Sequence, residues 1–331
     1  MALPRRRDVP DVAALAGSRH VGVGAVSRRT RVTPWVETPL ADLPADRRAV
    51  LTTLRPDLCG LNLDRPRIMG ILNVTPDSFS DGGEVPSVRA AVARARAMQA
   101  DILDIGGEST RPGAQEVSVA DEIARTVPVI RAIRDAGIAT PISIDTRKAA
   151  VARAALAAGA DMVNDVTALR YDPDMAGVVA EAGVPVCLMH SVADPATMQA
   201  HATYADVLLD VYDHLAGRIA AAISAGIDPK NIIVDPGIGF GKTLQHNVTL
   251  LRQIALYHGL GHAILLGASR KRFIGTISGV DHPADRLAGS LAVALHGAAH
   301  GVQILRVHDT KETRQALSLH LALSGTDDHG T

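Results

Sequence analysis

Short apolar runs recur along the chain from about residue 67, and each run ends in a polar or small residue. They lie at 67–75, 101–109, 141–146, 161–166, 185–190, 231–237, 263–269 and 303–309. Runs of this length, bounded by polar residues, are typical of buried β-strands. The pattern therefore predicts eight strands.

Alanine-rich segments of helical character lie between these runs. Residues 87–100 place apolar side chains three and four positions apart, and the segments 147–160 and 285–301 reach Gly159 and Gly301, which are expected to end helices. Strands that alternate with helices predict a parallel sheet, and eight such units close a (β/α)8 TIM barrel. An open, doubly wound α/β sheet is the alternative, and the lack of a GxGxxG motif after the first strand disfavours it.

Residues 1–66 lie outside this rhythm. Residues 1–30 are rich in Arg, Gly, Ala and Val without a convincing period, and we expect them to be mobile or loosely packed. The stretch LADLPADRRAVLTTL (40–54) predicts a short helix. We thus divide the chain into a partly flexible N-terminal extension (1–66), a catalytic (β/α)8 barrel (67–323) and a C-terminal tail (324–331).

Composition narrows the class of protein. Only 2% of the 331 residues are aromatic, so the core is built from aliphatic side chains and base stacking is disfavoured. The net charge of −1 gives no indication of nucleic acid or an anionic membrane as a partner. Cys59 and Cys187 are not in a CxxC pair, which argues against zinc and a disulfide framework and favours a reducing, cytoplasmic location. Because no run of 18 apolar residues occurs and no hydrophobic stretch follows Arg5–Arg7, we expect neither a membrane span nor a signal peptide.

The carboxyl end of every predicted strand carries a polar or charged side chain. Catalytic groups of TIM barrels gather at this end. Strand ends also meet solvent in any barrel, but that does not require a carboxylate or amide at the end of five strands. The residues are Asn73, Asp104, Asp145, Asn164 with Asp165, His190, Asp235, Ser269 with Arg270 and Lys271, and Arg306 with His308.

These side chains suggest the chemistry of a ligand. Buried aspartates need partners, so an acceptor-rich pocket suits a heterocycle with several N–H donors or a hard cation with oxygen ligands. Lys271, Arg306 and His308 add positive charge on the last two strands, where such barrels often bind phosphate. The pattern therefore indicates a donor-rich heterocycle joined to a phosphate or pyrophosphate.

The segment GIGFGKT (237–243) looks like a phosphate-binding P-loop but does not match one. That motif needs four residues between its first Gly and its Gly-Lys pair, which would put a Gly at Pro236. A glycine-rich bend beside the barrel mouth is the simpler interpretation, and nucleotide hydrolysis is not expected.

Two long motifs and several short ones resemble those of the dihydropteroate synthase family. The long ones are GILNVTPDSFSDGG (70–83) and DIGGESTRPGA (104–114), and the short ones follow in the family's order from SIDTRK (143–148) to RVHD (306–309). The resemblance covers about residues 67–320. It implies a (β/α)8 barrel that condenses 4-aminobenzoate with a hydroxymethyl-dihydropterin pyrophosphate to give dihydropteroate and pyrophosphate in folate biosynthesis. The resemblance further implies magnesium (Mg2+) as the cofactor, a homodimer, and an enzyme of the kind that sulfonamides target.

The resemblance also implies roles for individual residues. Asn73 matches the magnesium ligand, and Arg306 and His308 match the pyrophosphate-binding pair. Lys271, Asp104 and Arg111 are the expected catalytic residues. The pterin would contact Asp145, Asn164, Asp235 and Lys271, and the aminobenzoate pocket would be shaped by two loops that carry Phe79, Thr110, Arg111 and Pro112 together with Ser269 or Arg270.

Other interpretations stay open at this point. Asp104 could cap a turn, Phe79 could be ordinary packing, and His190 could be a core histidine with no chemical role. After LMH (188–190) the chain reads SVADPATMQ, which departs from the family near the pterin face. A related pterin-binding methyltransferase would lack the ESTRPG loop, and a non-catalytic or altered-substrate paralogue would be expected to lose Asn73, Arg111 or Lys271; the chain has all of these features.

Overall fold

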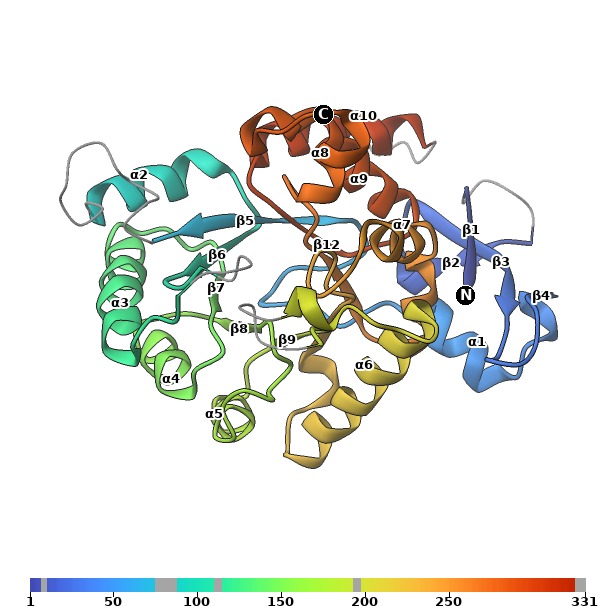
Figure 1. Ribbon diagram of the computed structural model, residues 1–331, viewed down its shortest axis with the longest axis horizontal. Coiled ribbons are helices and arrows are strands. Elements are labelled where there is room, and N and C mark those ends of the chain that lie inside the picture. Colours follow the sequence, from blue (N-terminus) through green and yellow to red (C-terminus); the bar gives the residue numbers. More distant parts are fainter. Residues whose placement is uncertain (7–10, 75–87, 110–114, 193–197, 325–331) are drawn as a thin grey trace.

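A closed barrel of parallel strands dominates the structure, a computed structural model that describes residues 1–6, 11–74, 88–109, 115–192 and 198–324 (Figure 1). Neighbours around the barrel follow chain order, and the last strand pairs with the first. The predicted eight strands and the (β/α)8 fold are therefore confirmed. The strands are β5 (Arg67–Asn73), β6 (Ile102–Gly106), β7 (Ile142–Asp145), β8 (Met162–Asp165), β9 (Val186–Met189), β10 (Ile232–Asp235), β11 (Ala263–Leu266) and β12 (Ile304–Val307).

Helices follow the strands and cover the outside of the barrel (Figure 1). Their ends have local causes: the Ser118 hydroxyl accepts the Asp121 N–H at the start of α3, and Gly159 and Gly301 have positive φ just beyond α4 and α9, as expected of residues that end helices. The helices are α2 (Val88–Met98), α3 (Val119–Asp135), α4 (Ala149–Ala157), α5 (Met175–Ala182), α6 (Val207–Ser224), α7 (Leu244–Arg252), α8 (Arg272–Ser278), α9 (Leu287–Ala299) and α10 (Thr310–Leu323).

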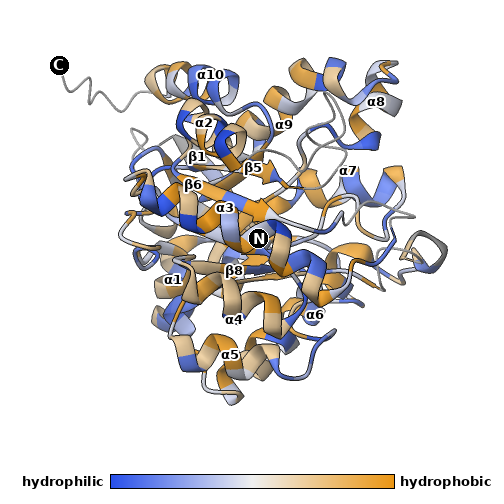
Figure 2. Ribbon diagram, turned by 90° about the vertical axis from the view of Figure 1, so that its left-hand side faces the viewer, coloured by the Kyte–Doolittle hydropathy of each residue, from blue (hydrophilic) through white to orange (hydrophobic). Residues whose placement is uncertain are grey.

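The core lies between the strands and this helical layer. Its buried side chains are almost all Ile, Leu, Val, Ala and Met, in keeping with the low aromatic content. Figure 2 shows β5 as hydrophobic, while the helices around it carry hydrophilic segments. Within the described part of the chain, no helix combines the length and the apolar character needed to cross a membrane.

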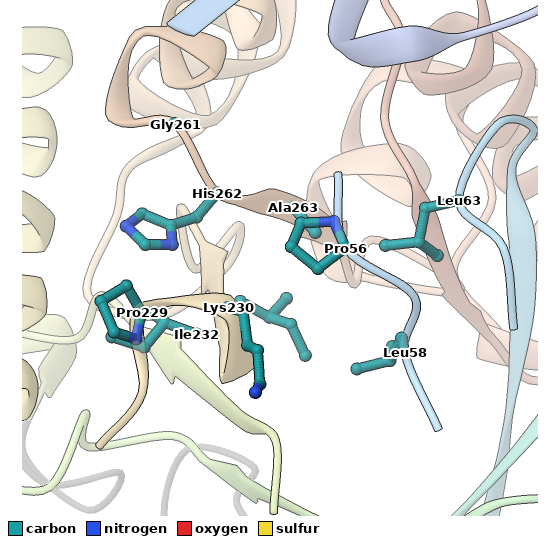
Figure 3. A pocket seen from close by; sticks show the side chains of 10 residues that line it. Pro56, Leu58, Leu63, Pro229, Lys230, Ile232, Gly261, His262 and Ala263 are labelled. Carbon is teal, nitrogen blue, oxygen red and sulfur yellow. The ribbon is translucent and has the colours of Figure 1, made fainter. Parts of the chain in front are cut away.

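The segment that leads into β5 closes the amino end of the barrel. Leu58 and Leu63 pack against the interior side chains near the starts of the strands, including Met69 and Ile304. A cavity of about 230 Å³ remains between this segment and the starts of β10 and β11, lined by Pro56, Lys230 and His262 among others (Figure 3). The barrel is therefore filled at this end, and the strand ends that carry polar residues face the other way.

The described part of the N-terminal extension is not the loosely packed segment that we expected. It forms an antiparallel sheet of β1 (Ala2–Arg6), β2 (Ala13–Ala14), β3 (Val21–Arg28) and β4 (Val36–Pro39), followed by the predicted short helix α1 (Ala45–Thr52). Its apolar side chains bury Ala255 of the 3-10 helix η6 (Ile254–Leu260), which belongs to the barrel. Arg31 also donates to Asp210 and Asp213 of α6, each at 2.6 Å. The extension is thus a small layer packed on the barrel's side.

Candidate active site

Strand register aligns four residues across one side of the barrel mouth. Asn73 pairs in register with Gly106, Gly106 with Asp145, and Asp145 with Asn164. Asp104 lies two residues before Gly106 on β6, so its side chain lies on the same face of the strand as that position, one layer deeper in the barrel. It is fully buried. The sequence-predicted acceptors of β5 to β8 are therefore brought together.

Arg306 connects two of these carboxylates from β12. Its Nε lies 2.6 Å from Asp104 Oδ2, and its Nη2 lies 2.6 Å from Asp145 Oδ2. The Oδ1 atoms of both aspartates are buried and have no hydrogen-bond partner among the described residues. Buried carboxylate oxygens without a donor are costly, so they favour a ligand that brings N–H groups.

The pKa values of Asp145 and Arg306 reflect their burial and the charges around them. Burial raises the pKa of Asp145, with Arg306 opposing the shift and Asp104 adding to it. Burial works against the charge of Arg306, but Asp104 and Asp145 outweigh it and keep the pKa of that guanidinium above its ordinary value. The two carboxylates thus share one cation, and a further positive charge or N–H donor beside Asp145 would favour its charged form.

Asp235 and Lys271 form the opposite wall. Asp235 Oδ1 accepts the Gly237 N–H at 2.7 Å, and burial raises the pKa of Asp235 while Lys271 opposes the shift. Lys271 Nζ donates to the Ile238 carbonyl and lies 4.5 Å from the centre of the Phe240 ring. Burial lowers the pKa of Lys271 to about 8. The ammonium is therefore charged at neutral pH, but it loses its proton at a much lower pH than an exposed lysine does.

The last strands also hold the candidate phosphate ligands. His308 Nδ1 lies 3.1 Å from Ser269 Oγ, which also accepts the His308 N–H at 3.2 Å. Arg270 is paired with Asp309. Arg306, expected beside His308 at the pyrophosphate, turns its guanidinium toward the two aspartates in this structure.

Four of the expected binding residues lie outside the described residues. These are Phe79 in 75–87 and Thr110, Arg111 and Pro112 in 110–114. Their roles stay predictions, and so does the effect of the departure from the family after His190, which falls partly in 193–197.

Two groups of residues near the site had no assigned role in the sequence analysis. Arg147 Nε donates to Glu108 Oε2 at 3.2 Å, and Lys148 Nζ donates to Glu122 Oε2 at 2.7 Å; all four side chains are buried or nearly so. They support the chain just before 110–114. The sequence did offer a signal for this group, because Arg147 and Lys148 of SIDTRK and Glu108 of DIGGES are charged residues inside motifs.

The second group joins the loops after β9 and β10. Lys242 Nζ lies 2.9 Å from His190 Nδ1, and the His190 and His214 rings meet edge to face at 4.7 Å. Burial, with Lys242 adding to it, lowers the pKa of His190 to about 2. His190 is therefore a neutral, buried histidine that contacts a lysine.

Asn73 is the residue expected to bind magnesium, and its surroundings test whether a hard ion would fit there. No cluster of three or more His, Cys, Asp or Glu side chains is arranged to hold a metal within the described ranges. Asn73 is half-buried at the end of β5, and its Oδ1 lies on the side of Gly106 that Asp145 Oδ2 also faces. One amide oxygen at the rim suits a hard ion that takes its other ligands from waters and phosphate oxygens.

Comparison with known proteins assigns the family. Residues 69–308 match the model of the family described as pterin binding enzyme. The chain is 45% identical over 262 residues to the dihydropteroate synthase of Synechocystis sp. (78% of this chain, 90% of the relative) and 46% identical over 260 residues to that of Escherichia coli (78% and 91%). The structure of Xanthomonas albilineans dihydropteroate synthase with 4-aminobenzoic acid matches with a TM-score of 0.76 at 48% identity, covering 82% of this chain and 98% of the other. The chain belongs to the pterin-binding enzyme family and, within it, to the dihydropteroate synthases.

Proposed function

We propose that this chain condenses 6-hydroxymethyl-7,8-dihydropterin pyrophosphate with 4-aminobenzoate to give 7,8-dihydropteroate and pyrophosphate. The observation that carries the proposal is the pair of buried aspartates, Asp104 and Asp145, whose Oδ1 atoms have no hydrogen-bond partner among the described residues. The Xanthomonas albilineans enzyme has been solved with 7,8-dihydropteroate, and the Thermus thermophilus enzyme with 4-aminobenzoate. These relatives supply the identity of the two ligands.

The pterin is assigned to the acceptor side chains of the central strands. Asp145, Asn164 and Asp235 would accept the N–H groups of its amino-pyrimidine edge, and charge-assisted bonds of this kind are strong and specific. Lys271 would donate to the pterin from the opposite wall. The Ile238 carbonyl and the Phe240 ring already hold its ammonium in place.

The pyrophosphate is assigned to the rim on β12 and β5. His308 and Arg306 would bind it, which requires Arg306 to exchange at least one aspartate for the phosphate oxygens. Asn73 would hold a magnesium ion together with those oxygens. Magnesium there would neutralise charge that develops on the leaving group.

The reaction then follows from charge. The bond between the pterin methylene carbon and the pyrophosphate oxygen breaks, and the oxygen keeps the electron pair. Positive charge spreads over the methylene and the pterin ring, where Asp104, Asp145 and Asp235 stabilise it. The neutral aniline nitrogen of 4-aminobenzoate attacks the methylene carbon, forms the C–N bond and loses a proton.

Access of the second substrate is assigned to the loops of residues 75–87 and 110–114. Phe79, Thr110, Arg111 and Pro112 would shape the aminobenzoate pocket, and Arg111 would meet its carboxylate. Exclusion of water matters here, because water would trap the cation as the alcohol.

A cytoplasmic homodimer is part of the proposal, and so is inhibition by sulfonamides, since the Yersinia pestis relative has been solved as a sulfonamide complex.

The test is direct. Purified protein is incubated with magnesium, the pterin pyrophosphate and labelled 4-aminobenzoate, and labelled dihydropteroate is measured beside a Lys271→Ala sample. We expect product with the first protein and almost none with the second. A folded protein that binds the pterin but makes no product would refute the synthase activity and point to a non-catalytic or altered-substrate paralogue.

A further inference from the structure

Lys242 is a buried amine whose hydrogen-bond partners are neutral groups. It is 4% exposed, and its Nζ lies 2.9 Å from His190 Nδ1, 2.9 Å from the Phe240 carbonyl and 3.4 Å from the His190 carbonyl. Burying an ammonium is costly unless its protons are bonded, and burial lowers the pKa of Lys242 to about 7. An apolar residue would fill the same space without this cost, so the amine has a role beyond packing.

The contacts of Lys242 join two loops that meet at the barrel mouth. His190 follows β9, and Phe240 lies in the turn of residues 237–241 that follows β10. The loops are in close contact, because a Cβ at Gly237 would lie 2.0 Å from the His190 carbonyl oxygen. Tyr204 adds a second tie by donating to the Gly241 carbonyl at 2.8 Å.

The same turn supports Lys271. Lys271 Nζ donates to the Ile238 carbonyl and lies over the Phe240 ring, and a Cβ at Gly239 would come within 2.9 Å of Lys271 Cδ. Residues 238–240 are thus the surface on which the Lys271 side chain lies. Since Lys242 binds the Phe240 carbonyl, it holds one end of that surface.

We propose that Lys242 is a positioning residue. Through the turn of residues 237–241 it fixes the Phe240 ring and the Ile238 carbonyl, and these orient Lys271 toward the pterin. The proposal rests on the proposed function in one respect, namely that Lys271 binds the pterin pyrophosphate. Lys242 itself does not contact the substrate.

The experiment is a double-mutant cycle in binding. The dissociation constant of the pterin pyrophosphate is measured by calorimetry for the wild type, Lys242→Met, Lys271→Met and the double variant. Lys242→Met keeps the aliphatic stem and removes the donor, and we expect it to weaken binding about tenfold, as for a lost hydrogen bond from a charged group. If Lys242 acts through Lys271, the same substitution in the Lys271→Met background weakens binding less than about twofold.

Two further variants separate positioning from packing. Lys242→Gln keeps a donor for the Phe240 carbonyl, so its affinity should lie between those of the wild type and Lys242→Met. Lys230→Met removes an exposed lysine paired with Asp228 at the opposite end of the barrel and should bind like the wild type. If Lys242→Met does not fold, a folded Lys242→Gln with affinity reduced at least threefold supports the proposal.

Three results would overturn the inference while leaving the proposed function intact. They are wild-type affinity in a folded Lys242 variant, equal losses in the Met and Gln variants, and an undiminished effect of Lys242→Met in the Lys271→Met background. Failure of the wild-type protein to bind the pterin pyrophosphate would instead overturn the assignment of Lys271 and the proposed function with it.

Discussion

Replacing Arg306 by Met should lower the folding stability of the protein, because Arg306 bridges two buried carboxylates. The change keeps an apolar side chain of similar length but leaves Asp104 and Asp145 without their cation. Removing one partner of a buried ion pair costs about 3–5 kcal/mol of folding stability. Because 19% of the Arg306 side chain is exposed and solvent screens part of its charge, we expect a loss near the lower end of that range, about 3 kcal/mol at pH 8.

The loss should depend on pH with a defined sign. Burial raises the pKa of Asp145 even beside Arg306, and removing the guanidinium raises it further. A carboxyl whose pKa is higher in the folded state stabilises the fold while it is protonated, and that stability is lost as the pH rises through the folded-state pKa. The deficit of Arg306→Met should therefore be largest at pH 8 and shrink toward pH 5.

Urea unfolding of both proteins between pH 5 and pH 8 measures this. Arg306→Met combined with Asp104→Asn should recover about 1 kcal/mol at pH 8, because only one charged carboxyl then remains. Arg153→Met, which breaks an exposed pair with Glu181, is the control and should stay within about 0.5 kcal/mol of the wild type. A pH-independent deficit, or one below about 1 kcal/mol, would refute the idea that these aspartates depend on Arg306.

Three further predictions follow from the same geometry. Pterin binding should weaken as the pH rises through about 8, because Lys271, with its lowered pKa, loses its charge there. Calorimetry across pH 6.5–9.5 should show this fall in affinity for the wild type but not for Lys271→Met. A fall that persists in Lys271→Met would assign it to another group. Gly237→Ala should cost more than about 2 kcal/mol in urea unfolding, since φ is +68° and a Cβ would meet a backbone carbonyl at 2.0 Å; Gly279→Ala, with φ of +71° and open space around it, is the matched control and should lose less. Arg147→Gln should lower kcat/KM for 4-aminobenzoate about fivefold by loosening Glu108, and an unchanged value would show that this pair does not support the adjacent loop.

The barrel could be predicted from the sequence because its strands are covered on both faces. Such strands have nearly continuous apolar sequences, and the eight runs stand out from the Ala-rich helices between them. The polar residue at each strand end followed from the same alternation. Register then aligned Asn73, Asp145 and Asn164 without any further information, since neighbouring parallel strands end at one edge.

The N-terminal sheet could not be predicted in the same way. β2 has two residues and β4 has four, so no period can develop, and β3 mixes Gly with Val. Its apolar side chains are completed by Ala255, which lies more than 200 positions further along the chain. The direction of the Arg306 guanidinium was hidden for a related reason, because its partners Asp104 and Asp145 are 202 and 161 residues away.

The segment GIGFGKT shows why the chemistry of a motif depends on what surrounds it. Glycines and a lysine after a strand suggest a cradle for phosphate, but here Gly237 allows a neighbouring carbonyl to approach, and Gly239 makes room for the stem of Lys271. Lys242 is buried, and its Nζ is bonded to His190 and the Phe240 carbonyl. A lysine that binds phosphate must keep its ammonium free for the ligand, whereas this one has its protons in use within the protein. In the proposed function the cation that binds the pterin is instead Lys271, which lies one strand later and whose ammonium contacts the glycine-rich turn at Ile238 and Phe240.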